Sequence, residues 1–121
     1  MLSEYEFLEQ KNILILKSPL IYRLQDSLDT LRGVADLIKK YNYPNVLGDF
    51  RGLNIDFSIW SAIEKPKEWK QVGISRDIKV AALFDKLNDK KIIRINSLFS
   101  SGFNVTFFTN YDEAIEYLSK I

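Results

Sequence analysis

Two carboxylates in this sequence have the spacing expected of residues that bind a metal ion or act in acid–base catalysis. Asp49 and Asp85 lie at, or just after, the ends of two short apolar runs that predict buried strands. Open α/β sheets bind ligands at the carboxyl ends of their strands, so this pair could hold Mg²⁺ or act in acid–base steps. The alternative is that each carboxylate caps the helix after its strand. We favour capping, because no third ligand, glycine-rich phosphate loop or partnered lysine accompanies the pair in the sequence.

Two hydroxyls form the second group that could carry chemistry. Ser58 and Ser61 fall in a short predicted helix for which Asp56 or Ser58 can serve as the N-cap. A phosphate accepted near a helix N-terminus would be stabilised by the helix dipole. The alternative is that these serines are an N-cap and an exposed helix hydroxyl.

Composition removes most other catalytic chemistry. The chain contains no cysteine and no histidine. Disulfides, thiolate nucleophiles, serine–histidine relays and zinc or iron sites built on these residues are therefore excluded. We expect a protein that is not an enzyme and needs no metal or cofactor.

Charge and hydropathy indicate the kind of partner to expect. The 17 basic and 16 acidic residues interleave along the chain and give a net charge of +1. Nucleic-acid binders gather a basic excess on one face, so we expect no nucleic-acid partner. The N-terminus is acidic and lacks the features of a signal peptide, and the longest apolar run, residues 13–16, is far too short to span a bilayer. We expect a cytoplasmic protein with no stable membrane insertion.

The strongest candidate for a binding surface is the aromatic and polar stretch from residue 54 to residue 70. Its proline and its charges predict an irregular segment with Trp69 exposed. Tryptophan beside lysine can form a binding hot spot or an anchor to lipid headgroups. The alternative is core packing by Trp60 and an ordinary solvated face for the lysines. The residues of the expected binding surface are Asn54, Asp56, Ser58, Trp60, Ser61 and Trp69. Should Trp69 be buried instead, the working face is expected at the helix between Asp85 and Ser101.

Hydrophobic periodicity predicts the fold. Short apolar runs predict strands over 5–9, 13–16, 46–50, 78–84 and 104–108, and helical stripes cover 24–38, 87–99 and 110–118, besides the short helix near 56–63. Gly102 is placed to cap the C-terminal end of the 87–99 helix, and Asn110, followed three residues later by Glu113, predicts the start of the last helix. Buried strands separated by helices favour a parallel sheet with helical cover. We therefore expect one α/β domain over 1–121, with a mostly parallel five-stranded sheet, an antiparallel first strand and about four helices. The strand residues expected to be deeply buried are Ile13, Ile15, Val46, Leu47, Val80, Ala82, Val105 and Phe107.

Three stretches carry a resemblance to a known family. They are the sequence Asp-Phe-Arg-Gly-Leu at 49–53, the strand at 79–83 and the ending at 105–118. With their spacing, the chain resembles the STAS superfamily of sulfate-transporter and anti-sigma-factor-antagonist domains, and within it the SpoIIAA-like group of stand-alone bacterial proteins. It is distantly similar to the CRAL-TRIO lipid-binding domains as well.

The resemblance implies a regulatory function. In regulatory STAS proteins a partner kinase phosphorylates a serine in the loop after the central strand, and an ungapped overlay places Ser58 near that phosphoacceptor. The leading hypothesis is therefore a non-enzymatic binding or regulatory module that contacts a protein partner or a second copy of itself. The alternative is a domain for a lipid or another small apolar ligand. Its pocket would be lined by residues such as Phe57, Trp60, Phe84, Leu98 and Phe103.

Overall fold

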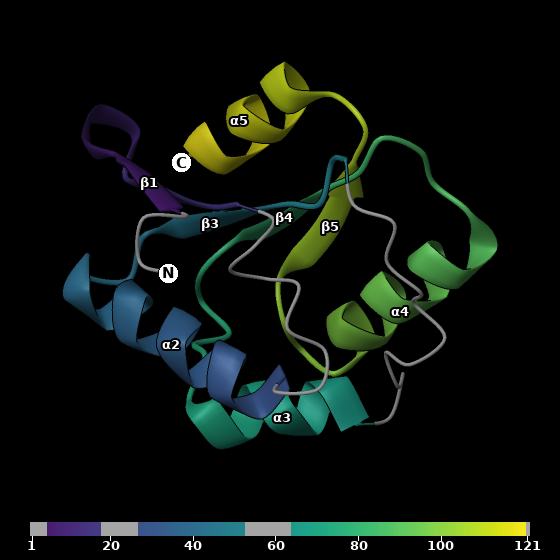
Figure 1. The fold of residues 1–121 in the computed structure, drawn as a ribbon, viewed down its shortest axis with the longest axis horizontal. Coiled ribbons are helices and arrows are strands. Elements are labelled where there is room, and N and C mark those ends of the chain that lie inside the picture. Colours follow the sequence, from purple (N-terminus) through teal and green to yellow (C-terminus); the bar gives the residue numbers. More distant parts are fainter. Residues whose placement is uncertain (1–4, 18–26, 53–63, 121) are drawn as a thin grey trace.

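The fold is described by a computed structural model over residues 5–17, 27–52 and 64–120 (Figure 1). Those ranges hold a five-stranded sheet, four α-helices and a single 3-10 turn over Glu9–Lys11. The strands are β1 (Tyr5–Leu8), β2 (Ile13–Leu16), β3 (Asn45–Asp49), β4 (Val80–Leu83) and β5 (Val105–Phe108). The helices are α2 (Ser27–Lys40), α3 (Glu64–Val72), α4 (Asp89–Ser100) and α5 (Tyr111–Ser119). The predicted α/β fold is confirmed.

The sheet follows the order of the chain, β1-β2-β3-β4-β5. Only β1 runs antiparallel to its neighbour, as predicted, and the other three pairs are parallel. Parallel neighbours need crossover connections, which are right-handed in nearly all proteins. Because each crossover here moves one strand further in the same direction, a constant hand places the crossover helices on the same face of the sheet.

Each face of the sheet has its own apolar core. Leu14, Val46 and Ala82 point to the face covered by α2, α3 and α4. Ile13, Leu47 and Ala81, their alternating neighbours, point to the face covered by α5 (Figure 1). Strands buried on both faces need apolar residues at every position, which is why these strands read as unbroken apolar runs.

Local signals place the last two elements before the C-terminus. Gly102 has a φ of 97°, which a residue with a side chain rarely adopts, and its N–H donates to the carbonyl of Phe99 at 3.0 Å. Asn110 accepts a hydrogen bond from the N–H of Glu113 at 2.9 Å and caps α5. Both caps were predicted from the sequence.

Three expectations about single elements are wrong. The segment around Pro66 is not irregular but lies in α3, because proline is tolerated in the first turn, where the missing N–H has no helical partner. Val80 and Phe107 are only partly buried. Val80 lies at the first position of β4, and Phe107 lies on the last strand of the sheet, which has a neighbour on one side only.

Among the helices of the described ranges, none is both long enough and apolar enough to cross a bilayer.

Candidate functional site

Most of the predicted binding surface lies outside the described residues. This applies to Asn54, Asp56, Ser58, Trp60 and Ser61, and therefore to the predicted phosphoacceptor. Trp69 is the one member of that set that the structure places.

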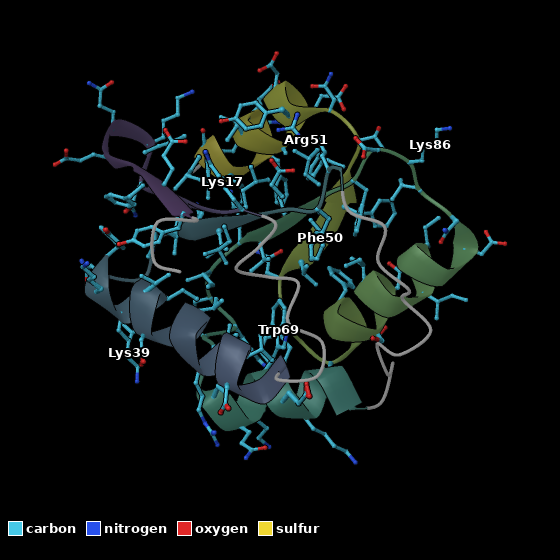
Figure 2. All side chains as sticks on the ribbon, viewed as in Figure 1. Lys17, Lys39, Phe50, Arg51, Trp69 and Lys86 are labelled. Carbon is cyan, nitrogen blue, oxygen red and sulfur yellow. The ribbon has the colours of Figure 1, made fainter. Side chains whose placement is uncertain are left out.

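Trp69 is a core residue, so the expectation that it is exposed was wrong. Its side chain is only 8% exposed and meets the ring of Phe103 edge-on at a centroid distance of 5.2 Å. Lys67 and Lys70 of the same helix are exposed, and α3 therefore turns its aromatic residue inward and its lysines outward. Among the described residues, nothing accepts a hydrogen bond from the buried indole N–H. Figure 2 shows Trp69 between the sheet and α3.

The carboxyl edge of the sheet carries side chains of alternating charge on the α5 face. Lys17, Asp49 and Asp85 each continue the alternation of a strand whose preceding inward residue packs under α5. The Nζ of Lys17 lies 3.8 Å from a carboxylate oxygen of Glu6 on β1. We call this row the charge ladder, and its members across the sheet are Glu6, Lys17, Asp49, Arg51 and Asp85.

Asp49 and Arg51 form the tightest pair of the charge ladder. The Nε and Nη2 atoms of Arg51 donate to the two carboxylate oxygens of Asp49 at 3.0 and 2.9 Å, and the Arg51 N–H donates to the same group at 3.0 Å. Burial opposes ionisation of Asp49, but these hydrogen bonds and the charges of Arg51 and Lys17 together outweigh it. The pKa of Asp49 is therefore lowered. On the other side, the guanidinium of Arg51 lies 5.4 Å from the ring of Tyr111. Burial raises the pKa of the Tyr111 phenol.

Asp85 holds the loop that follows β3. One of its carboxylate oxygens accepts a hydrogen bond from the N–H of Gly52 at 2.7 Å. Gly52 has a φ of 78°, which favours glycine at this turn. The expected capping is therefore wrong for Asp85, because α4 begins only at Asp89 and the Asp85 carboxylate binds Gly52 instead. The helix that Asp49 was expected to cap lies outside the described residues. Nor do the described residues include any group of three or more acidic side chains close enough to hold a metal ion.

Aromatic rings lie beneath the charge ladder on the opposite face of the sheet. Phe50 stacks on Phe84 with ring centroids 5.1 Å apart, and Figure 2 shows Phe50 and Arg51 on opposite sides of the sheet. Phe84 and Phe103, two residues predicted to line an apolar pocket, are fully buried in the core with Trp69. Phe57 and Trp60 lie outside the described residues, as does the side chain of Leu98. The apolar-ligand hypothesis therefore stays a prediction.

A second surface of note is the flank formed by α4 and β5, which we call the α4–β5 flank. Ile93 and Phe99 on α4 are 54% and 62% exposed. Residues 95–111 contain no Asp, Glu, Lys or Arg, although 27% of the whole chain is charged. Since α4 packs directly on β5, the second half of α4, the turn after it and β5 lie next to one another (Figure 1). The nearest cation that the structure places against this stretch is Arg76, whose guanidinium lies 4.7 Å from the ring of Phe103.

The two edges of the sheet differ in their protection. β1 carries Glu6, which pairs with Lys17, and the rings of Tyr5 and Phe7 pack against Tyr41 at the end of α2. Charges on an edge strand discourage the addition of another strand. β5 has the sequence Val-Thr-Phe-Phe and carries no charge. The α4 part of this surface corresponds to the helix between Asp85 and Ser101, the alternative working face named from the sequence for a buried Trp69. The β5 part was not expected, and its signal in the sequence is the absence of charge in 95–111.

Comparison with known proteins adds no relative. No protein-family model, no curated protein and no solved structure matches the chain.

Proposed function

We propose that this chain is a non-enzymatic binding module that acts through protein–protein contacts, and that the α4–β5 flank is its working face. The observation that carries the proposal is the exposure of two large apolar side chains, Phe99 within the uncharged stretch 95–111 and Ile93 just before it. Depletion of charge and enrichment of aromatic residues distinguish the centres of protein interfaces from the remaining surface.

The backbone of β5 supports a protein as the partner. An edge strand presents N–H and C=O groups that another strand can pair with. The combination of peptide-bonding groups and apolar side chains fits a polypeptide better than a nucleic acid or a small anion. We assign the charge ladder a structural role and not a binding role, because Asp49 and Asp85 already bind Arg51 and Gly52.

The resemblance to the STAS superfamily supports a regulatory role of this kind. The phosphoswitch at Ser58 is a further hypothesis within it. It predicts that a phosphorylated Ser58 alters binding, and mass spectrometry of the protein from its native host tests whether this serine is modified.

Site-specific cross-linking in the native host tests the proposed function. A photoreactive phenylalanine analogue replaces Phe99 on the flank or, as the control, Tyr43, which is 48% exposed and lies after α2. We expect a discrete covalent adduct from position 99 and none, or a weaker one, from position 43. The absence of an adduct at position 99, or the same adducts from both positions, would contradict the proposal.

A further inference from the structure

We infer that the partner of the α4–β5 flank is a second copy of this chain, joined through antiparallel pairing of the two β5 strands about a two-fold axis. The inference rests on the proposed function, because both assign the flank to contact with protein. It goes further in naming the occupant and the atoms that pair.

The hydrogen-bonding pattern of β5 shows which backbone groups face outward. The carbonyls of Asn104 and Phe108 accept from β4-side N–H groups, those of Val80 and Phe84, at 2.8 and 2.9 Å. In a parallel ladder, successive residues of a strand alternate between the two sides. Phe107 therefore directs its N–H and C=O away from β4. No further strand follows β5 in the described part of the chain.

This edge is self-complementary. Two antiparallel copies of β5 that cross at Phe107 would exchange two hydrogen bonds, from each Phe107 N–H to the Phe107 carbonyl of the other copy. The neighbouring outward N–H, that of Val105, is already satisfied within the chain by the carbonyl of Phe103 at 3.0 Å. A two-fold axis at Phe107 therefore uses the outward donor and acceptor of this residue in both copies.

The charge of the surface favours a copy of itself as the occupant. Residues 95–111 bring no charge of their own to the interface, so this stretch adds no repulsion between two copies. A charged partner would lose hydration here and find no opposite charge in return. The other edge of the sheet is not free of charge in this way. Pairing of two β1 strands would bring two Glu6–Lys17 pairs into the interface.

The same two-fold axis accounts for the exposed residues of α4. The axis of an antiparallel strand pair stands perpendicular to the sheet, so both α4 helices would lie on the same face of one continuous ten-stranded sheet. Paired strands lie about 4.8 Å apart. Because α4 packs on β5, the two helices would approach the distance of about 8–10 Å at which helices pack. Ile93 and Phe99 would then be covered by the α4 helix of the other copy.

Sedimentation equilibrium of the full chain over a range of concentrations tests the inference. We expect a species of twice the 14.1 kDa chain mass that dissociates on dilution. Two double variants place like charges across the axis: Ile93→Lys with Phe99→Lys, and Ile93→Glu with Phe99→Glu. Each alone should be monomeric, with Kd raised about a hundredfold or more. An equal mixture of the two should recover the dimer. Tyr43→Lys is the matched control, since it adds the same charge to an exposed apolar residue outside the flank.

The sedimentation results support or overturn the proposed dimer as follows. A dimer that persists in both double variants, or a mixture that stays monomeric, would overturn it, provided that circular dichroism shows both variants folded. A wild-type chain that is monomeric at every concentration would overturn it too. In that case the mass of the adduct from position 99 separates the two proposals. An adduct with a different protein would leave the proposed function standing, and no adduct would remove both.

Discussion

At the scale of single residues, the carboxylates of Asp49 and Asp85 in the charge ladder already accept hydrogen bonds from groups of the same chain. Asp49 accepts three hydrogen bonds from Arg51, and Asp85 accepts one from Gly52. An aspartate that is satisfied in this way is a poor general base, because its lowered pKa and its occupied oxygens both oppose proton abstraction. The network instead fixes the start of the loop after β3.

The pH dependence of the free energy of unfolding should reflect the hydrogen bonds between Asp49 and Arg51. The pKa of Asp49 lies below the value of about 3.9 that an unfolded aspartate has, so its contribution is present above that pH and is lost as the pH falls through the folded value. Asp49→Asn should lower the free energy of unfolding at pH 7 by about 1 kcal/mol, since the pair is partly exposed. The difference from the wild type should shrink towards zero in strong acid.

Urea unfolding at pH 7 and at about pH 3 measures this difference. Arg51 stays charged and Tyr111 stays neutral over this range, because the pKa of each is raised, so they add no pH dependence of their own. Asp29→Asn is the control, because Asp29 pairs with Arg32 on the exposed face of α2. A difference for Asp49→Asn that is equal at the two pH values would contradict the account of this pair.

Because both carboxylates already have partners within the chain, we expect the stability of the fold not to depend on a divalent metal ion. Neither Asp49 nor Asp85 is expected to exchange its backbone and guanidinium partners for Mg²⁺. The midpoint of thermal unfolding should be the same with EDTA and with millimolar Mg²⁺. A rise of several degrees with Mg²⁺ would show a site that stabilises the folded state by mass action.

At the scale of elements, the chain is predictable wherever one signal acts over a short range. The unbroken apolar run at 13–16 predicted β2, and Asn110 with Glu113 predicted the start of α5. α3 was mispredicted because Pro66 reads as a helix breaker, although the first turn tolerates it. The burial of Trp69 depends on which side of α3 faces the core. The lysines next to Trp69 in the sequence made the whole segment look exposed to solvent.

Trp69 should now behave as a core residue. Trp69→Ala should lower the free energy of unfolding by about 3–5 kcal/mol, because it leaves a cavity beside Phe103. Trp69→Phe, which keeps a ring and removes the unpartnered N–H, should cost clearly less. Chemical unfolding of the two variants measures both values. A loss for Trp69→Ala within about 1 kcal/mol would instead match a surface residue.

Asn45 ties the end of α5 to the start of β3 and to Lys79, the residue before β4. Asn45 at the start of β3 donates to the carbonyl of Leu118 at 2.7 Å and accepts from the N–H of Lys79 at 3.2 Å. Asn45→Ala leaves both of these partly buried groups unpaired, so it should cost about 1–3 kcal/mol in unfolding free energy. Amide exchange should show the added opening in the last turn of α5. Equal protection of α5 in the variant and the wild type would contradict this role.

At the scale of the whole molecule, the described residues protect one edge of the sheet, β1, with charged and aromatic side chains. At the other edge, β5 carries no charge and pairs with no second strand among the described residues. The sequence named α4 as an alternative working face, but the contribution of β5 could not be predicted from motifs. Its signal is an absence of charge that extends through the second half of α4, a turn and β5. Only the packing of α4 on β5 joins those segments into one surface.

Amide hydrogen exchange of Phe107 tests the central claim, that β5 pairs with the β5 strand of a second copy of this chain, most directly. In the isolated chain the N–H groups of Thr106 and Phe108 face β4, whereas that of Phe107 faces outward. The account predicts that Phe107 is protected at high protein concentration and loses protection on dilution and in the Ile93→Lys, Phe99→Lys variant. Thr106 and Phe108 should stay protected throughout. Exchange of Phe107 at the rate of an unprotected amide under every condition, with Thr106 and Phe108 protected, would contradict the pairing of β5 with another strand.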